Sequence, residues 1–229
     1  MKKIIQLFVF VIICSCNSQN KKQNLAEKIK VSHMKNQEDY NKLIDKSIEK
    51  FDIESFYKDN KEGLPKSYIL SNNFQIEESA GDNGSWFLRA IAKKGSLFTV
   101  YKSYYYTGKI EAKRVNLFNN SCLIGIRYEF DENGKLINEI NEDKPFKISI
   151  FDIIEYLKKN QADLYNVTTN VNRYYDEKTK KATWTLSYRG KYKDVVGILR
   201  VEIDDESTDV ISVIRITGKM GEKEIIFKK

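Results

Sequence analysis

Adjacent carboxylates are the residues of this sequence best suited to catalysis. They occur as Glu77 with Glu78 and as Asp204 with Asp205, and two acids alone can hydrolyse a glycosidic bond. Successive side chains of a strand point to opposite faces, so the members of each pair cannot face one substrate. We therefore interpret these pairs as solvated surface charges. No catalytic residue is expected, and the protein is predicted not to be an enzyme.

Histidine and metal chemistry have little support. The single histidine, His33, excludes a multi-histidine metal site and most schemes with a histidine general base. Carboxylates at close spacing, as in Asp204, Asp205, Glu206 and Asp209, suit calcium. These four lack the regular ligand spacing of a calcium loop, however. We expect neither a metal nor a cofactor.

The first sixteen residues have the order of a secretion signal. Lys2 and Lys3 precede an apolar run, Ile4 to Ile13, which small residues follow. The run is about half the ~20 residues that a membrane-spanning helix requires. It predicts export without a transmembrane anchor.

The end of this signal, Ile13-Cys14-Ser15-Cys16, resembles the lipobox of bacterial lipoproteins. The resemblance implies that residues 1–15 are the signal peptide and that Cys16 carries the lipid. Cys14 is the alternative attachment site, and an ordinary secretion signal is the alternative interpretation. A lipid-anchored chain would lie in the cell envelope, at the periplasmic or surface face of an outer membrane.

Residues 16–35 are polar and predict a flexible tether. Removing 15 of the 229 residues, which include two of the 39 basic ones, leaves 214 residues with 37 basic and 32 acidic side chains. Both signs are interspersed, and the concentrated basic stripe that nucleic acid requires is absent. We expect contact with a membrane through the lipid and no nucleic-acid partner.

Cys122 is the only free thiol left if Cys16 is lipidated and Cys14 is removed with the signal. One cysteine cannot form an internal disulfide. It lies beside Leu123 and Ile124 in a predicted strand, so we interpret it as a small buried apolar side chain.

Residues 36–64 have the pattern of an amphipathic helix. Apolar residues recur at spacings of three and four, with charged residues between them, at Tyr40, Leu43, Ile44, Ile48 and Phe51. Packing on a sheet is the expected role, and docking to a partner is the alternative.

Residues 65–145 predict β-hairpins joined by tight turns. In the clearest one, alternating apolar residues enter and leave Asn133-Gly134. An Asn-Gly pair favours a type I′ turn, because both central positions of that turn have positive φ.

Two hairpin segments are alike, Tyr105 to Ile110 and Phe130 to Leu136. Each places an aromatic residue before a turn glycine, which Lys and an aliphatic residue follow. This pattern resembles the MORN-like hairpin repeats of a family of antitoxins. The resemblance implies an immunity protein that neutralises a delivered toxin.

Residues 146–229 predict one helix and further strands. Ser149 and Asp152 have the spacing of a capping box, and Trp184, Leu186 and Tyr188 alternate with polar residues as in a half-buried strand. The order of elements resembles a PepSY-like module. The predicted class is α+β, with antiparallel β-hairpins or a meander followed by a helix packed on an antiparallel sheet. The sequence does not decide whether the two β regions form one continuous sheet or two separate ones.

The tyrosines Tyr104, Tyr105 and Tyr106 are the candidate partner surface, because aromatic residues are enriched in protein interfaces. Core packing is the alternative interpretation of the same residues. The favoured function is a non-catalytic envelope protein that binds another protein. Toxin immunity is the alternative, and a carboxylate-based hydrolase of envelope polymers is the least favoured.

Overall fold

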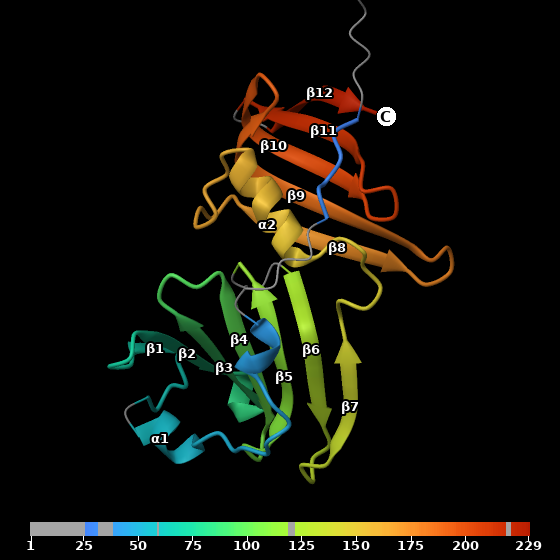
Figure 1. Cartoon of the computed structure of the whole chain (residues 1–229). Coiled ribbons are helices and arrows are strands. Elements are labelled where there is room, and N and C mark those ends of the chain that lie inside the picture. Colours follow the sequence, from blue (N-terminus) through green and yellow to red (C-terminus); the bar gives the residue numbers. More distant parts are fainter. Residues whose placement is uncertain (1–25, 32–38, 59, 119–121, 219–220) are drawn as a thin grey trace, which may run out of the picture.

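Two antiparallel sheets form the framework of the protein (Figure 1). The computed structural model describes residues 26–31, 39–58, 60–118, 122–218 and 221–229. The first sheet has seven strands in sequence order. They are β1 (Lys66–Ile69), β2 (Phe74–Ala80), β3 (Trp86–Lys93), β4 (Phe98–Tyr105), β5 (Ile110–Leu117), β6 (Cys122–Phe130) and β7 (Leu136–Asn141), with a short 3-10 turn, η2 (Asp82–Gly84), between β2 and β3. The antiparallel meander expected from the sequence is present.

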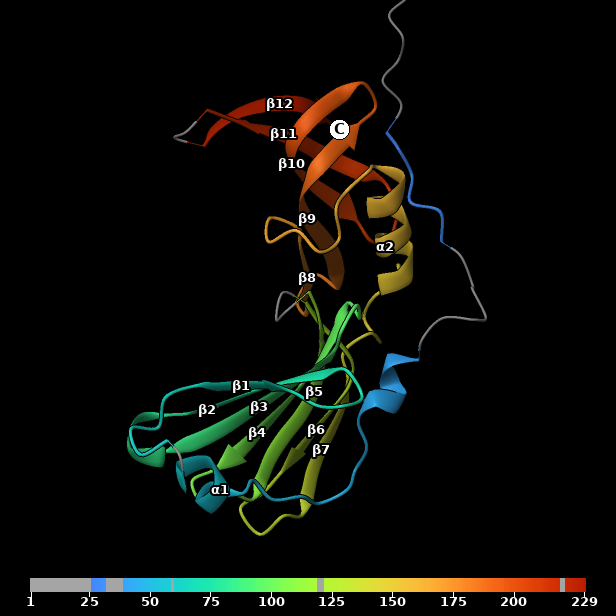
Figure 2. The same ribbon diagram turned by 90° about the vertical axis from the view of Figure 1, so that its left-hand side faces the viewer.

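The second sheet has five strands in the order β12-β11-β10-β9-β8. These are β8 (Asn170–Asp176), β9 (Lys181–Tyr192), β10 (Val195–Asp204), β11 (Val210–Thr217) and β12 (Glu222–Lys228). One helix, α2 (Ile150–Lys159), lies along this sheet (Figure 2). The inward side chains of β9 and β10 are fully buried: Trp184, Leu186, Tyr188, Leu199, Val201 and Ile203.

The helix α2 begins as the sequence predicts. Ser149 accepts a hydrogen bond from the backbone N–H of Asp152, whose carboxylate accepts one from the Ser149 N–H. Its inward side chains, Ile150, Ile153, Ile154 and Leu157, are buried. Strands account for 51% of the described residues, so the α+β expectation holds in a strongly β-dominated form.

The segment 39–58, called the strap below, is not the helix that its periodicity predicts. It contains only a 3-10 turn, η1 (Tyr40–Leu43), and a short helix, α1 (Ile53–Lys58). Between them Phe51 donates a backbone hydrogen bond to Gly108 at 2.7 Å, in the turn between β4 and β5. The extended path buries Tyr40, Ile44 and Phe51 against the sheet and leaves Ile48 68% exposed. Tertiary burial therefore outweighs the helical pattern.

Residues 26–31 are docked on the five-stranded sheet. Ile29 donates a backbone hydrogen bond to Thr208 at 2.8 Å, and Val210 donates one to Glu27 at 2.8 Å. Ile29 is only 4% exposed. The prediction of a flexible tether across 16–35 is therefore wrong for residues 26–31, because strand pairing and one buried isoleucine hold them. The rest of that range lies outside the described residues.

The predicted hairpin of β6 and β7 is present, but its turn is not type I′. Gly134 has a positive φ, 87°, whereas the φ of Asn133 is negative. Gly134 donates its backbone N–H to the Asp131 carbonyl at 2.8 Å. The Asp131 carboxylate accepts hydrogen bonds from the N–H groups of Asn133 and Lys135, both at 2.9 Å. These bonds favour a longer turn that closes on a left-handed glycine.

The two segments that are alike in sequence form alike turns. Gly108 has a φ of 76° and donates its N–H to the Tyr105 carbonyl at 2.8 Å, as Gly134 does to Asp131. The Tyr105 hydroxyl donates to the Phe130 carbonyl at 2.7 Å and so ties the two hairpins together.

One ion pair links the two sheets. Arg173 of β8 donates to the carbonyl of Leu123 at 2.7 Å and to Asp143 at 2.8 Å. Asp143 also accepts hydrogen bonds from the Tyr40 hydroxyl at 2.6 Å and from the Gly125 N–H at 3.1 Å. The strap, β6 and β8 are thereby fastened at one point, and buried residues of both sheets form one continuous core.

Candidate functional site

The strap covers one face of the seven-stranded sheet, here called the inner face; the opposite, outer face has no described helix over it (Figure 2). Strand register places a row of charged residues across the middle of the inner face. Glu78 lies opposite Arg89, Arg89 opposite Lys102, and Lys102 opposite Lys113. The most buried of them is Lys113, which is 1% exposed. A covered face normally carries apolar side chains.

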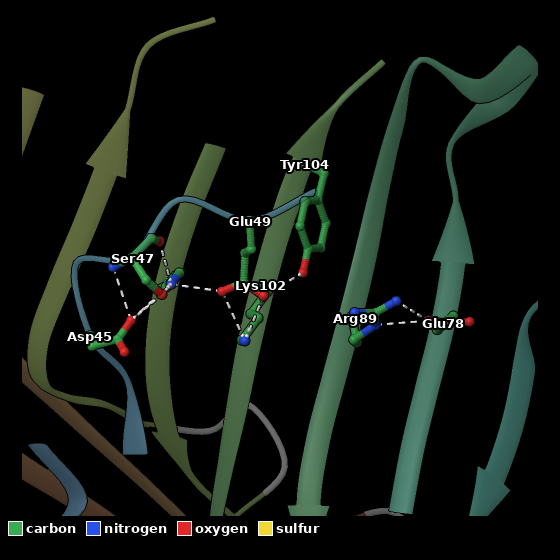
Figure 3. Close-up of polar contacts among 8 residues, drawn as sticks. Asp45, Ser47, Glu49, Glu78, Arg89, Lys102 and Tyr104 are labelled. Carbon is green, nitrogen blue, oxygen red and sulfur yellow. Dashed lines mark hydrogen bonds and ion pairs between the residues drawn. The ribbon is translucent and has the colours of Figure 1, made fainter. Parts of the chain in front are cut away.

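The strap supplies a carboxylate that binds both lysines (Figure 3). Glu49 contacts Lys102 at 2.8 Å and Lys113 at 2.6 Å. Lys113 also donates to the Ser47 carbonyl at 2.7 Å and contacts Asp45 at 3.2 Å. Like charges directly opposite each other destabilise a sheet. The carboxylate of Glu49 is therefore what allows two facing lysines to be covered.

A second ion pair holds the aromatic part of the strap. Arg89 binds Glu78 through two nitrogens, both at 2.7 Å (Figure 3). Its guanidinium lies 5.2 Å from the ring centroid of Phe51, and that ring stacks on Phe87 at 4.8 Å. The charged row therefore contacts the strap at two residues, Glu49 and Phe51, which are separated by Lys50.

This cluster is suited to fastening the strap and not to acid–base catalysis. Burial alone would raise the pKa of Glu49, but hydrogen bonds from Lys102 and Lys113 outweigh it and hold the pKa below its usual range. A general acid at neutral pH requires the opposite shift. Glu49 is thus ionised near neutral pH, and the interaction is structural.

Two carboxylates of the acidic run considered for calcium, Asp205 and Asp209, are bound by other protein groups. Asp205 is 3% exposed and accepts hydrogen bonds from Lys147 N–H, Ile148 N–H and the Trp184 indole. Asp209 is bound by Lys229. In the described part of the chain, no group of three or more His, Cys, Asp or Glu residues is arranged to hold a metal.

The prediction that Tyr104, Tyr105 and Tyr106 form one partner surface is wrong. Tyr104 is fully buried on the inner face, where its hydroxyl lies 3.4 Å from Glu49. Tyr105 is partly buried and bonded to Phe130, and Tyr106 lies in the turn and is 61% exposed. The three side chains do not form one surface, because strand alternation sends Tyr104 into the core and the strand ends before Tyr106.

The outer face of β3 and β4 is uncharged. Register and alternation place eight side chains there, which are Trp86, Leu88, Ala90, Ala92, Thr99, Tyr101, Ser103 and Tyr105. None carries a charge, in a chain that is 31% charged. Trp86 is 45% exposed, and Arg114 of the adjacent strand lies 5.5 Å from the Tyr101 ring centroid.

The other sheet provides an internal comparison. Two of its inner strands, β9 and β10, are buried on one face by alternating apolar residues. Their opposite face carries Arg189, Arg200 and Glu202, as expected for a face in contact with water. The uncharged outer face of β3 and β4 is therefore a local feature.

Cys122 is a buried thiol, as its apolar neighbours predict; it is 3% exposed. Burial raises its pKa to about 11, so little of the thiolate forms near neutral pH.

In a chain with Cys14→Ser and Cys16→Ser, we expect iodoacetamide at pH 8 to modify folded Cys122 at least tenfold more slowly than the unfolded chain. Mass spectrometry of timed samples measures both rates. Equal rates would contradict the burial.

No protein-family model, curated protein or solved structure matches this chain. Among the described residues, no helix is long and apolar enough to cross a membrane. His33, Cys14 and Cys16 lie outside the described residues. The expected lipid attachment therefore stays a prediction from the sequence.

Proposed function

We propose that this chain is a non-catalytic, lipid-anchored protein of the cell envelope that binds a partner protein through the outer face of β3 and β4. The observation that carries the proposal is the set of eight uncharged side chains on that face, with Trp86 and Tyr101 among them. Interface cores are depleted of charged residues and enriched in aromatic residues and arginine. Arg114 beside Tyr101 adds that third component.

Site-specific photocrosslinking in cells tests this contact. With benzoylphenylalanine at Leu88, a discrete crosslinked band is expected, because Leu88 lies at the centre of the uncharged face. The same group at Val196, which is 68% exposed on the other sheet, is the matched control. A band that is equally strong from both positions, or absent from Leu88, would contradict the proposed surface.

A charge placed on this face should remove the band. Ser103→Lys adds a cation that the interface would have to desolvate, so we expect at least a tenfold loss of crosslinking from Leu88. Ser103→Ala, which is also uncharged, should retain it. If the lysine variant crosslinks as well as the parent, the partner does not use this face.

Attachment to the membrane is tested separately. Replacing Cys16 with Ala removes the thiol that would carry the lipid, so the protein should lose palmitate label and leave the membrane fraction. Cys14→Ala should leave both unchanged. Labelling that persists in the Cys16 variant would argue against this anchor.

Toxin immunity is the second candidate, and the matching turns at Gly108 and Gly134 favour it. In that case the partner is a toxin domain. Deleting the gene should make cells sensitive to siblings that deliver the toxin, and the Ser103→Lys protein should fail to restore resistance. Unchanged survival after deletion would remove this candidate.

A further inference from the structure

A pocket of about 410 Å³ lies where the two sheets meet. Four pieces of chain line it: the start of β6, the end of β7, the loop that follows, and β8 with the turn after it. Its lining includes the side chains of Ile140, Glu142, Phe146, Tyr174, Tyr175 and Glu177. None of them belongs to the outer face of β3 and β4. Pockets at such junctions are common ligand sites.

The pocket follows an unpaired strand edge. In the described part of the chain, β8 pairs with β9 alone and forms the end of its sheet. Tyr174 and Tyr175 are consecutive and so point to opposite faces of the strand, yet both line the pocket. The pocket therefore wraps the outer edge of β8. The start of β6 approaches this edge where Arg173 binds the Leu123 carbonyl, so an added strand would pair with the backbone N–H and C=O groups beyond that point.

Its charge is negative. The one cationic lining residue, Arg173, is already bound to Asp143 and to the Leu123 carbonyl. Glu142 shares Arg127 with Glu129, so that group carries one net negative charge.

Glu177 adds a second negative charge and has no ion pair among the described residues. Together with the group around Glu142, it gives the pocket an excess of two carboxylates, of which Lys180 beside the Tyr175 ring offsets one.

Aromatic rings complete a site for a cation. Tyr174 is 66% exposed, and Lys180 lies 6.0 Å from the Tyr175 ring centroid. Deeper in, the Arg173 guanidinium packs 4.4 Å from the Phe146 centroid. Ring faces attract lysine and arginine side chains, and neighbouring carboxylates strengthen that preference.

We propose that an extended segment of a partner protein adds to the free edge of β8 and places a lysine or arginine side chain in this pocket. Backbone pairing supplies affinity and the charged pocket supplies specificity, as in other cases of strand addition. Glu142 and Glu177 would bind the ammonium or guanidinium group, and Tyr174 would cover it. The proposal does not rest on the function assigned to the outer face.

Immobilised heptapeptide libraries with a fixed central residue test the proposal. The full mature chain is incubated with libraries centred on Arg, Lys, Glu or Leu, with every other position varied. We expect at least tenfold more retention on the Arg and Lys libraries than on the Glu library. Equal retention on all four, or retention on none, would overturn the proposal.

Two variants and one modified library separate the parts of the interaction. Glu142→Gln/Glu177→Gln should lose the preference for Arg and Lys, whereas Glu54→Gln/Glu222→Gln, which removes two exposed carboxylates elsewhere, should keep it. N-methylated Arg peptides, which cannot pair with a strand edge, should bind at least tenfold more weakly. A preference that survives the pocket substitutions would overturn the cation site, and unchanged binding of N-methylated peptides would overturn strand addition.

Discussion

Replacing Glu49 with Ala is expected to lower the free energy of unfolding by about 3 to 5 kcal/mol, which is the typical cost of leaving a buried ion without its partner. Lys113 would keep only Ser47 and the exposed Asp45 as partners, while its side chain stays 2% exposed. Lys102 would lose the carboxylate that it binds at 2.8 Å. Urea unfolding followed by circular dichroism measures the change.

A double variant distinguishes loss of an ion pair from loss of packing. Glu49→Ala/Lys113→Met removes the buried cation together with its partner, so it should be more stable than the sum of the two single variants by about 0.5 to 3 kcal/mol. Glu54→Ala, an exposed carboxylate of α1, should change stability by less than about 0.5 kcal/mol. Strict additivity of the two substitutions would contradict direct coupling.

The same carboxylate predicts a dependence on pH. Because the folded-state pKa of Glu49 is below its ordinary value of 4.5, its contribution is fully present above pH 4.5. It is lost as pH falls through the folded-state pKa. Stability measured between pH 7 and pH 3 should decline less steeply at the acid end in Glu49→Gln than in the parent.

Asp205→Ala is the second substitution with a large expected effect. One buried carboxylate accepts from Lys147 N–H at 2.7 Å, from Ile148 N–H at 3.0 Å and from the Trp184 indole at 2.8 Å. Each buried donor left without an acceptor costs about 1 to 3 kcal/mol. We expect a loss of about 3 to 5 kcal/mol, measured by urea unfolding with tryptophan fluorescence as the signal.

Two further variants make the Asp205 prediction specific. Asp205→Asn retains one accepting oxygen but turns an N–H₂ group toward these donors, so an intermediate loss is expected. Asp194→Ala, in the exposed turn between β9 and β10, should cost less than about 0.5 kcal/mol. If Asp205→Ala unfolds at the same urea concentration as the parent, the three bonds do not stabilise the fold.

Local signals predicted local structure. The capping box of Ser149 and Asp152 needs only four consecutive residues, and the strand of Trp184, Leu186 and Tyr188 needs only alternation. The strap could not be predicted in this way. Its partners lie more than fifty residues away, as Lys102 is from Glu49, and those contacts override a helical pattern of apolar residues.

One residue of the charged row, Lys113, can be recognised from the sequence. Lys113 alternates with Val115 and Leu117, so it occupies an inward position of an otherwise apolar strand face, which indicates a buried cation that needs a carboxylate. Which carboxylate forms the ion pair with Lys113 depends on the path of the strap. The uncharged face of β3 and β4 was also readable, but only once strand register showed which residues are neighbours.

The docking of residues 26–31 limits how far the molecule can stand from a bilayer. With the proposed lipid on Cys16, ten residue steps separate the acyl chains from Ala26, a span of at most about 35 Å at 3.3 to 3.6 Å per residue. If the chain were instead undocked as far as Asp39, 23 residue steps would separate it from Cys16, and the maximum span would be about 80 Å. With that lipid in place, the short β-bridge at Lys28 and Asp209 would keep the five-stranded sheet close to the bilayer and would restrict encounters to partners at the membrane surface.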